Sequence, residues 1–131
     1  MSLKTAKISI VIFGIILIIM SSISMYNFQG GIEVLTLPIK KKWFDMILSG
    51  EKKEEYREIK PYYTTRLSKI FNMVDDIPLD MPETQIRFTN GYGYKVPAFI
   101  ADCHLEKRTG RTEWGAEPGK EYYVLVIEKI R

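Results

Sequence analysis

The chain of 131 residues contains one cysteine, Cys103, and one histidine, His104. A disulfide within the chain is therefore excluded, as is a zinc site built from cysteine and histidine ligands. Serine-histidine-acid catalysis would depend on His104 alone, and no strained elbow motif marks a partner serine. We set this class of hydrolase aside, and we expect neither a metal nor a cofactor.

The chain also lacks a large excess of one charge. Its formal net charge is +3, but the first thirty residues hold two lysines, Lys4 and Lys7, and no acid. Removing these two leaves 17 basic residues against 16 acidic ones. Proteins that bind duplex nucleic acid usually carry a marked basic excess, so we expect no long duplex DNA as a partner. A local excess in residues 31–71, nine basic against six acidic, suits a nucleotide or a short single strand.

One long apolar run stands near the start of the chain, from Ile8 to Met25. Its eighteen residues are just enough to span a bilayer as a helix. Three alternatives stay open: a cleaved signal peptide, a single-span anchor, or translation that begins at Met25. The lysines at positions 40–42 oppose the orientation that Lys4 and Lys7 favour. Because an unpaired cysteine is unusual in a secreted domain, we favour a cytoplasmic body, anchored in the membrane or made from the later start.

A glycine joint, Gln29-Gly30-Gly31, separates this segment from the rest of the chain. We expect residues 1–30 to be the hydrophobic segment with its linker and residues 31–131 to form one domain. This length is enough for one hydrophobic core.

The first half of this domain predicts two helices, one strand before them and a second strand, Lys53–Arg57, between them. Ile32–Leu37 is rich in apolar and β-branched residues and stops at Pro38, which is typical of a strand. The apolar positions of Lys41–Ser49 fall on one helical face, and Gly50 ends that helix. A second helix is predicted from Pro61 to near Asn72.

The second half predicts strands joined by loops. Thr84–Asn90 alternates apolar and polar residues, and Asn90-Gly91 predicts a hairpin turn. Val96–Lys107 follows, with Phe99, Ala101, Cys103 and Leu105 on one face. Glu121–Ile130 is apolar on both faces at its centre, which is typical of a strand between two neighbours. Residues 74–83 and 109–120 are predicted to be loops.

This order of elements excludes a doubly wound parallel sheet, which needs strands and helices that alternate throughout. We expect an α+β fold: a small, mostly antiparallel β-barrel of about five or six strands with two helices packed outside, preceded by the N-terminal hydrophobic helix.

The most charged stretch is Gly50–Arg57, and a run of this kind usually forms a solvated surface. On an extended strand, Lys53, Glu55 and Arg57 would point one way, while Glu54 and Tyr56 would point the other way, with Tyr56 towards the core. Two alternatives stay open. The charges form a ligand site, or Glu55 and Arg57 form a structural ion-pair network that contributes about 0 to 1 kcal/mol if exposed.

The spacing Gly50-x-Lys52-x-x-Glu55-x-Arg57 resembles the signature of the ASCH domain, a branch of the PUA-like superfamily. A softer likeness is the Trp114–Lys120 loop that leads into the aromatic closing strand. The resemblance covers about residues 32–130 and includes the order of elements. It implies a PUA-like β-barrel with a cleft beside the first helix that suits RNA or a nucleotide.

The resemblance implies ligand-binding roles for Lys52, Glu55 and Arg57. Lys52 and Arg57 would meet a phosphate or a base carbonyl, and Glu55 would accept from a base amino group. Three further residues are expected nearby, as partners for stacking or contact with an unpaired base: Arg87, Tyr92 and Trp114.

Some members of the family are amidohydrolases that act on N4-acetylcytidine with a lysine, a threonine three residues later and a distant glutamate. Here Glu55 stands three residues after Lys52, so the threonine is absent. We therefore expect binding of RNA or a modified nucleotide. Two alternatives are kept: an amidohydrolase for an acylated nucleoside, with Lys52 and Glu55 as its catalytic pair, and a membrane-tethered protein-interaction module.

Overall fold

A computed structural model of the chain describes residues 34–79 and 83–131. The predicted hydrophobic helix of residues 8–25 lies outside the described residues, as does the joint at residues 29–31. Among the residues that are described, no helix is long and apolar enough to cross a membrane.

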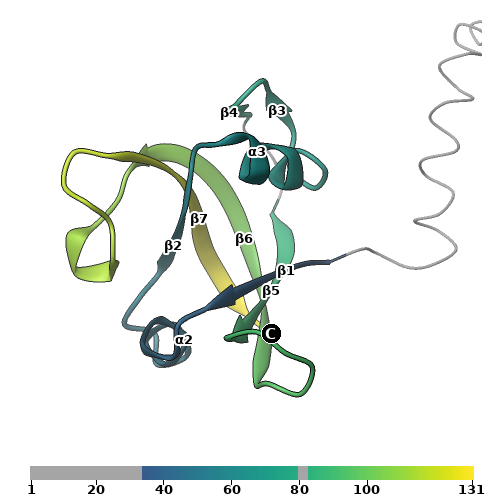
Figure 1. The fold of residues 1–131 in the computed structure, drawn as a ribbon, viewed down its shortest axis with the longest axis vertical. Helices are drawn as coiled ribbons and strands as arrows, with labels where there is room; N and C mark the ends of the chain where they lie inside the picture. Colours follow the sequence, from purple (N-terminus) through teal and green to yellow (C-terminus); the bar gives the residue numbers. More distant parts are fainter. Residues whose placement is uncertain (1–33, 80–82) are drawn as a thin grey trace, which may run out of the picture. The chain divides into compact units, whose positions relative to one another are not determined.

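The domain is built on a five-stranded mixed sheet with the strand order β1-β5-β6-β7-β2. β1 pairs with β5 in parallel, and the other neighbours are antiparallel. The sheet curls into a half-barrel with β1 and β2 as its two edges (Figure 1). With two helices beside it, this confirms the α+β class and a barrel-like sheet. The strands are β1 (Leu35–Ile39), β2 (Glu54–Glu58), β5 (Thr84–Asn90), β6 (Ala98–Thr109) and β7 (Glu121–Ile130).

Three predictions for the later strands are confirmed. β5 and β7 have the predicted bounds: apolar and polar residues alternate along β5, and β7 is a run rich in apolar and aromatic residues. The four residues predicted to share the core face of β6 are all buried. β7 lies between β6 and β2, so apolar side chains suit both of its faces.

Several predicted boundaries were wrong. β1 begins later than predicted and contains Pro38, which an edge strand tolerates because the missing N–H faces no neighbour. β6 begins at Ala98 instead of Val96 and runs on to Thr109. The connection between β5 and β6 is a loop of residues 91–97 instead of a tight turn at Asn90-Gly91, and the N–H of Asn90 bonds Pro97 O at 2.9 Å.

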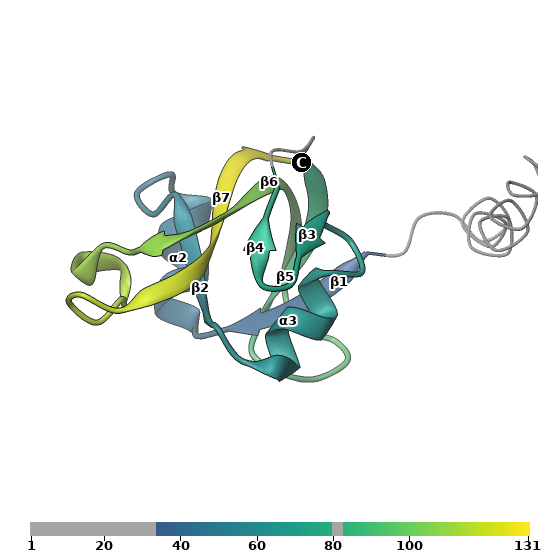
Figure 2. The ribbon, with the colours of Figure 1, turned by 90° about the horizontal axis from the view of Figure 1, so that it is seen from above.

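The two helices supply part of the core. α2 (Lys41–Leu48) connects the two edge strands (Figure 2) and buries Phe44 and Ile47. Gly50, with φ of 86°, follows it in a conformation that glycine adopts without strain. α3 (Pro61–Leu67) is shorter than the predicted helix and buries Leu67. Turns after α3 then bring Phe71 into the same core.

The segment predicted as a loop over residues 74–83 contains a short hairpin, so that prediction was wrong in part. β3 (Met73–Val74) pairs with β4 (Ile77–Pro78), and Asp75 turns the chain with φ of 57°. Aspartate occasionally adopts this conformation, because its short polar side chain can hydrogen-bond locally. Strands this short give no alternation from which to predict them. Residues 80–82 lie outside the described part of the chain.

The loop between β6 and β7 packs against β2 and α2 through two glycines. A Cβ on Gly110 would lie 2.5 Å from Cε1 of Tyr56, and a Cβ on Gly115 would lie 3.0 Å from Cζ2 of Trp43. Both glycines therefore allow backbone to approach an aromatic ring closely. The loop is held further by a hydrogen bond of 2.9 Å from the N–H of Arg111 to the Tyr56 hydroxyl.

We expect Gly110→Ala to lower the free energy of unfolding by about 1 to 3 kcal/mol, because the added methyl overlaps the Tyr56 ring. Gly110 does not have a φ in the left-handed region, so the effect is steric and not conformational. Urea denaturation would measure it. The penalty should shrink in a Tyr56→Leu background and persist in a Tyr56→Phe background. Equal penalties in all three backgrounds would contradict the contact.

Candidate functional site

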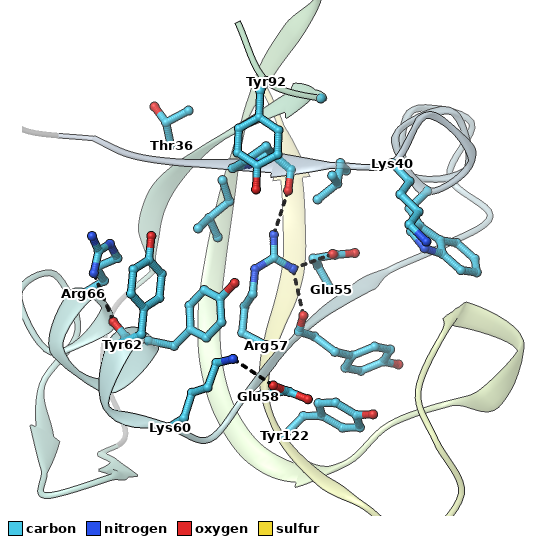
Figure 3. A pocket seen from close by; sticks show the side chains of 17 residues that line it. Thr36, Lys40, Glu55, Arg57, Glu58, Lys60, Tyr62, Arg66, Tyr92 and Tyr122 are labelled. Atoms are coloured by element: carbon cyan, nitrogen blue, oxygen red, sulfur yellow. Dashed lines mark hydrogen bonds and ion pairs between the residues drawn. The ribbon is translucent and has the colours of Figure 1, made fainter.

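A cleft of about 670 Å³ lies at the opening of the half-barrel, between the edge strands β1 and β2. α3 and the start of the 91–97 loop complete its walls (Figure 3). Its volume is in the range of sites for small organic ligands. The lining residues are Thr36, Leu37, Pro38, Ile39, Lys40, Trp43, Glu55, Tyr56, Arg57, Glu58, Lys60, Tyr62, Tyr63, Arg66, Gly91, Tyr92 and Tyr122.

Arg57 connects the two edges of the sheet across this cleft. Its Nη2 donates to the carbonyl oxygen of Pro38 on β1 at 3.1 Å, and its Nη1 donates to the carbonyl oxygen of Tyr56 on β2 at 2.8 Å. Nη1 also donates to Oε2 of Glu55 at 2.7 Å. The guanidinium therefore donates hydrogen bonds to one backbone carbonyl of each edge strand at the centre of the cleft (Figure 3).

Glu55 holds the two cations of the motif. Its Oε1 lies 2.6 Å from Nζ of Lys52, and its Oε2 lies 2.7 Å from Nη1 of Arg57. The side chains of Lys52, Glu55 and Arg57 are 1%, 8% and 11% exposed, so these charges do not form a solvated surface. The three formal charges sum to +1 in a desolvated place, which favours an anion nearby.

Lys52 does not line the cleft, although sequence reasoning made it a direct ligand contact. Its amine donates to Glu55 and to the carbonyl oxygen of Glu54. The amine also lies 5.3 Å and 5.1 Å from the ring centroids of Trp43 and Tyr56. Burial lowers the pKa of Lys52 below its usual range, and the nearby Glu55 carboxylate opposes this shift.

Tyrosines supply much of the remaining wall. Tyr62 and Tyr63, at the start of α3, meet edge to face with centroids 4.9 Å apart. The guanidinium of Arg66 lies 3.6 Å from the Tyr62 centroid. Tyr56 also lines the cleft and is half-buried, and the core that it faces is a second, smaller apolar cluster around Tyr122. The Tyr56 ring packs against Tyr122 at a centroid distance of 5.5 Å.

The charge of the cleft is positive. Its cations are Lys40, Arg57, Lys60 and Arg66, and its acids are Glu55 and Glu58. Both acids are already in ion pairs, Glu55 as described above and Glu58 with Lys60 and Lys120 at 3.1 Å and 2.9 Å. Hydrogen bonds from Lys120 and Lys60 lower the pKa of Glu58. The cleft therefore suits an anionic ligand that carries a flat ring.

The structure brings Glu55, Arg57 and Tyr92 together in the cleft, with Lys52 behind them. It does not bring Arg87 or Trp114 to the lining. Arg87 lies in the middle of β5, opposite Thr36 and Ile100. Trp114 lies in a short 3₁₀ helix of the β6–β7 loop (Thr112–Trp114), where Arg111 stacks 4.6 Å from its ring centroid.

Sequence reasoning missed several lining residues. It gave no binding role to Tyr62, Tyr63, Arg66, Lys40 or Lys60. A usable signal was present in the Lys60-Pro61-Tyr62-Tyr63 run directly after the motif strand, because it places two aromatics and a cation at a helix start.

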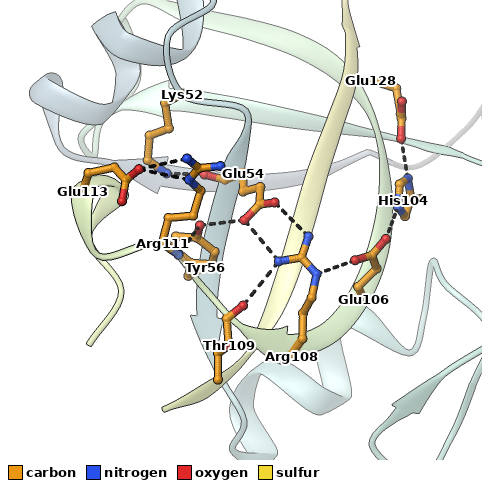
Figure 4. Close-up of polar contacts among 10 residues, drawn as sticks. All are labelled: Lys52, Glu54, Tyr56, His104, Glu106, Arg108, Thr109, Arg111, Glu113 and Glu128. Carbon is orange, nitrogen blue, oxygen red and sulfur yellow. Dashed lines mark hydrogen bonds and ion pairs between the residues drawn. The ribbon is translucent and has the colours of Figure 1, made fainter. Parts of the chain in front are cut away.

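A second polar network covers the outer face of β2, β6 and β7 (Figure 4). Arg108 bonds Glu54 at 2.8 Å and Glu106 at 2.5 Å, and Glu54 accepts a bond of 2.7 Å from the Tyr56 hydroxyl. His104 lies between two carboxylates, 2.6 Å from Glu106 and 2.5 Å from Glu128. Within the described residues, no group of three or more histidine, cysteine or carboxylate side chains has a geometry that could hold a metal ion.

Comparison with known proteins gave no match to a family model, to a curated protein or to a solved structure. The function is therefore argued from the geometry of the cleft.

Arg57→Ala should lower the free energy of unfolding by about 1 to 3 kcal/mol, because the carbonyl groups of Pro38 and Tyr56 lose their donor. The loss stays moderate because Glu55 retains its ion pair with Lys52. Arg57→Lys should recover only part of this, since an ammonium has no planar fork to reach three acceptors. Thermal and urea unfolding measure both variants. A loss below about 0.5 kcal/mol for Arg57→Ala would show that the bridge between the edges carries no stability.

We expect His104 to titrate above the usual pKa of its side chain. Burial opposes this shift, but the hydrogen bond and charge of Glu106, together with Glu128, outweigh burial and raise the pKa of His104. Its contribution to stability is therefore full below the pKa of the unfolded state, about 6.5, and is lost as pH rises through the higher folded pKa.

An NMR titration measures the pKa of His104 without overlap from other imidazole signals, because the chain has one histidine. Glu128→Gln and Glu106→Gln should each lower the pKa of His104, and His104→Gln should flatten the dependence of stability on pH near neutrality. A wild-type pKa at or below 6.5 would contradict the contacts with both carboxylates.

Proposed function

We propose that the domain binds RNA or a modified nucleotide in the cleft between β1 and β2. The observation that carries this proposal is the unfilled hydrogen-bonding capacity of Arg57 at the centre of a cationic, aromatic cleft.

Arg57 has five N–H groups, and three donate to Glu55, Tyr56 and Pro38. The remaining two, on Nε and on Nη2, have no partner among the described residues. Every buried side-chain nitrogen or oxygen in the described part of the chain has a partner, so the unpaired Nε is in contact with solvent. A phosphate or the acceptor edge of guanine offers oxygen or nitrogen atoms to such donors.

The walls supply the other half of nucleotide recognition. Base rings stack on aromatic side chains and on guanidinium planes, and the cleft offers Tyr62, Tyr63, Tyr92 and the Arg66–Tyr62 pair. Lys40, Lys60 and Arg66 add positive charge around these rings. This combination suits a ligand with both a flat base and a phosphate better than it suits a purely apolar ligand.

The resemblance to the ASCH domain agrees with this proposal. The cleft lies beside the first helix, and Glu55 and Arg57 of the motif line it. The half-barrel and the element order are compatible with a PUA-like domain. We therefore propose an ASCH-type, PUA-like binding domain.

Binding is favoured over amide hydrolysis by the position of Lys52. Its amine is buried, already donates to two acceptors and does not line the cleft, so a bound acyl group would not meet it without a rearrangement. The lowered pKa of Lys52 is the feature that a catalytic lysine would share, but here a buried structural position accounts for it.

Calorimetric titration of the full chain with nucleoside monophosphates and short single-stranded RNAs tests the proposal. Arg66→Ala and Lys40→Ala should each weaken binding by about 0.5 to 1.5 kcal/mol, because both cations stand at the wall of the cleft and remain partly hydrated. Arg57→Lys should weaken it further, by about 1 to 3 kcal/mol, since the planar fork is lost.

Lys53→Ala is the matched control, because Lys53 belongs to the same charged stretch but is exposed and does not line the cleft. Affinity should be unchanged in this variant. The proposal is rejected if the wild-type chain binds none of these ligands, or if Lys53→Ala weakens binding as much as the cleft variants do.

A further inference from the structure

The 91–97 loop presents two tyrosines to solvent beside the cleft. We propose that the ligand is a single-stranded RNA that leaves the cleft over this loop, with a neighbouring base stacked on Tyr94. This inference rests on the proposed function and names its ligand as a polymer with at least two unpaired bases.

The exposure of these tyrosines is the first observation. Tyr92 is 88% exposed and Tyr94 is 93% exposed, higher than the other large hydrophobic side chains in the described residues. Neither ring packs against another aromatic ring of the described chain. Tyrosine normally buries most of its ring, and stacking on an unpaired base covers such a face.

The position of the loop is the second observation. Tyr92 is itself a lining residue of the cleft, and Tyr94 follows it on the same loop but outside the lining. The base of the loop is tied to the cleft wall by a hydrogen bond of 2.9 Å from the N–H of Gly91 to Ile39 O on β1. Figure 3 shows Tyr92 on the β1 side of the Arg57 guanidinium. Because Tyr94 follows Tyr92 by two residues and is exposed, the loop offers a second ring to a strand that leaves the cleft past Tyr92.

Two glycines shape this loop. Gly91 and Gly93 have φ values of 80° and 123°, in the region that side chains rarely adopt. They flank Tyr92 and separate it from Tyr94, so the two rings stand on a turning backbone instead of an extended strand. The Thr89 hydroxyl fixes the start of the turn through a bond of 2.7 Å to Gly91 O.

Charge favours RNA over a protein as the occupant. Residues 91–97 contain Lys95 and no acid, and Lys40, which directly follows β1, is a cation of the cleft lining. Aromatic rings interleaved with cations form the pattern by which proteins hold a single strand without reading its sequence. The loop has no large aliphatic side chain besides Val96, so it offers little to an apolar protein surface.

The test compares ligands of increasing length on the full chain. Uridine monophosphate, the dinucleotide and oligouridylates of three and six nucleotides are titrated against the wild type, Tyr94→Ala and Tyr94→Phe. We expect the wild type to bind the six-nucleotide strand at least about five-fold more tightly than the monophosphate, a gain typical of one additional stacked base. Tyr94→Ala should remove this gain and leave the monophosphate affinity as it is.

Tyr94→Phe is the matched control, because it keeps the ring and loses only the hydroxyl, so it should keep the gain. A self-complementary RNA duplex should bind more weakly than the single strand, since its bases are not free to stack. The inference is overturned if chain length has no effect, if Tyr94→Ala leaves the gain intact, or if the duplex binds equally well. Failure of every ligand to bind the wild type overturns the proposed function itself, so the two failures are distinguishable.

Discussion

The Arg57 side chain joins the two edges of an open sheet, and the cleft depends on this contact. Edge strands present unpaired backbone groups that invite another chain to pair with them. Here one guanidinium takes a carbonyl oxygen from each edge, Pro38 on β1 and Tyr56 on β2. The half-barrel thus remains open for a ligand while part of its free backbone is satisfied, so one residue serves the fold and the proposed site together.

The position of Arg57 depends in turn on a buried charge arrangement. Glu55 lies between Lys52 and Arg57, and the Lys52 amine is covered by the rings of Trp43 and Tyr56. These rings are covered by the β6–β7 loop, which approaches them at Gly115 and Gly110. The charges of the motif are therefore the centre of a packed layer. Because these charges are desolvated, their ion pairs hold Arg57 in place. The net charge of +1 that remains would attract a phosphate group.

Sequence patterns predicted the regular strands, and they failed where contacts between distant segments determine the strand bounds or the cleft lining. β5 and the buried face of β6 were predictable because alternation reports burial directly, and β7 was predictable from its apolar centre. Pro38 was read as the end of a strand, since only the sheet order shows that β1 is an edge that accepts proline. Of the predicted site residues, Glu55, Arg57 and Tyr92 line the cleft, whereas Arg87 and Trp114, chosen for expected proximity alone, lie away from the cleft lining.

The sequence by itself determined the α+β class, the strands with strong alternation and the spacing that puts Glu55 and Arg57 on one side of a strand, because these features depend on local periodicity. Tertiary structure decided the burial of Lys52, the reach of Arg57 to Pro38 and the approach of the 91–97 loop to the cleft. The parallel pairing of β1 with β5 brings that loop beside β1, a contact between segments about fifty residues apart. No local pattern encodes such a pairing, since it results from how the whole chain buries its apolar faces.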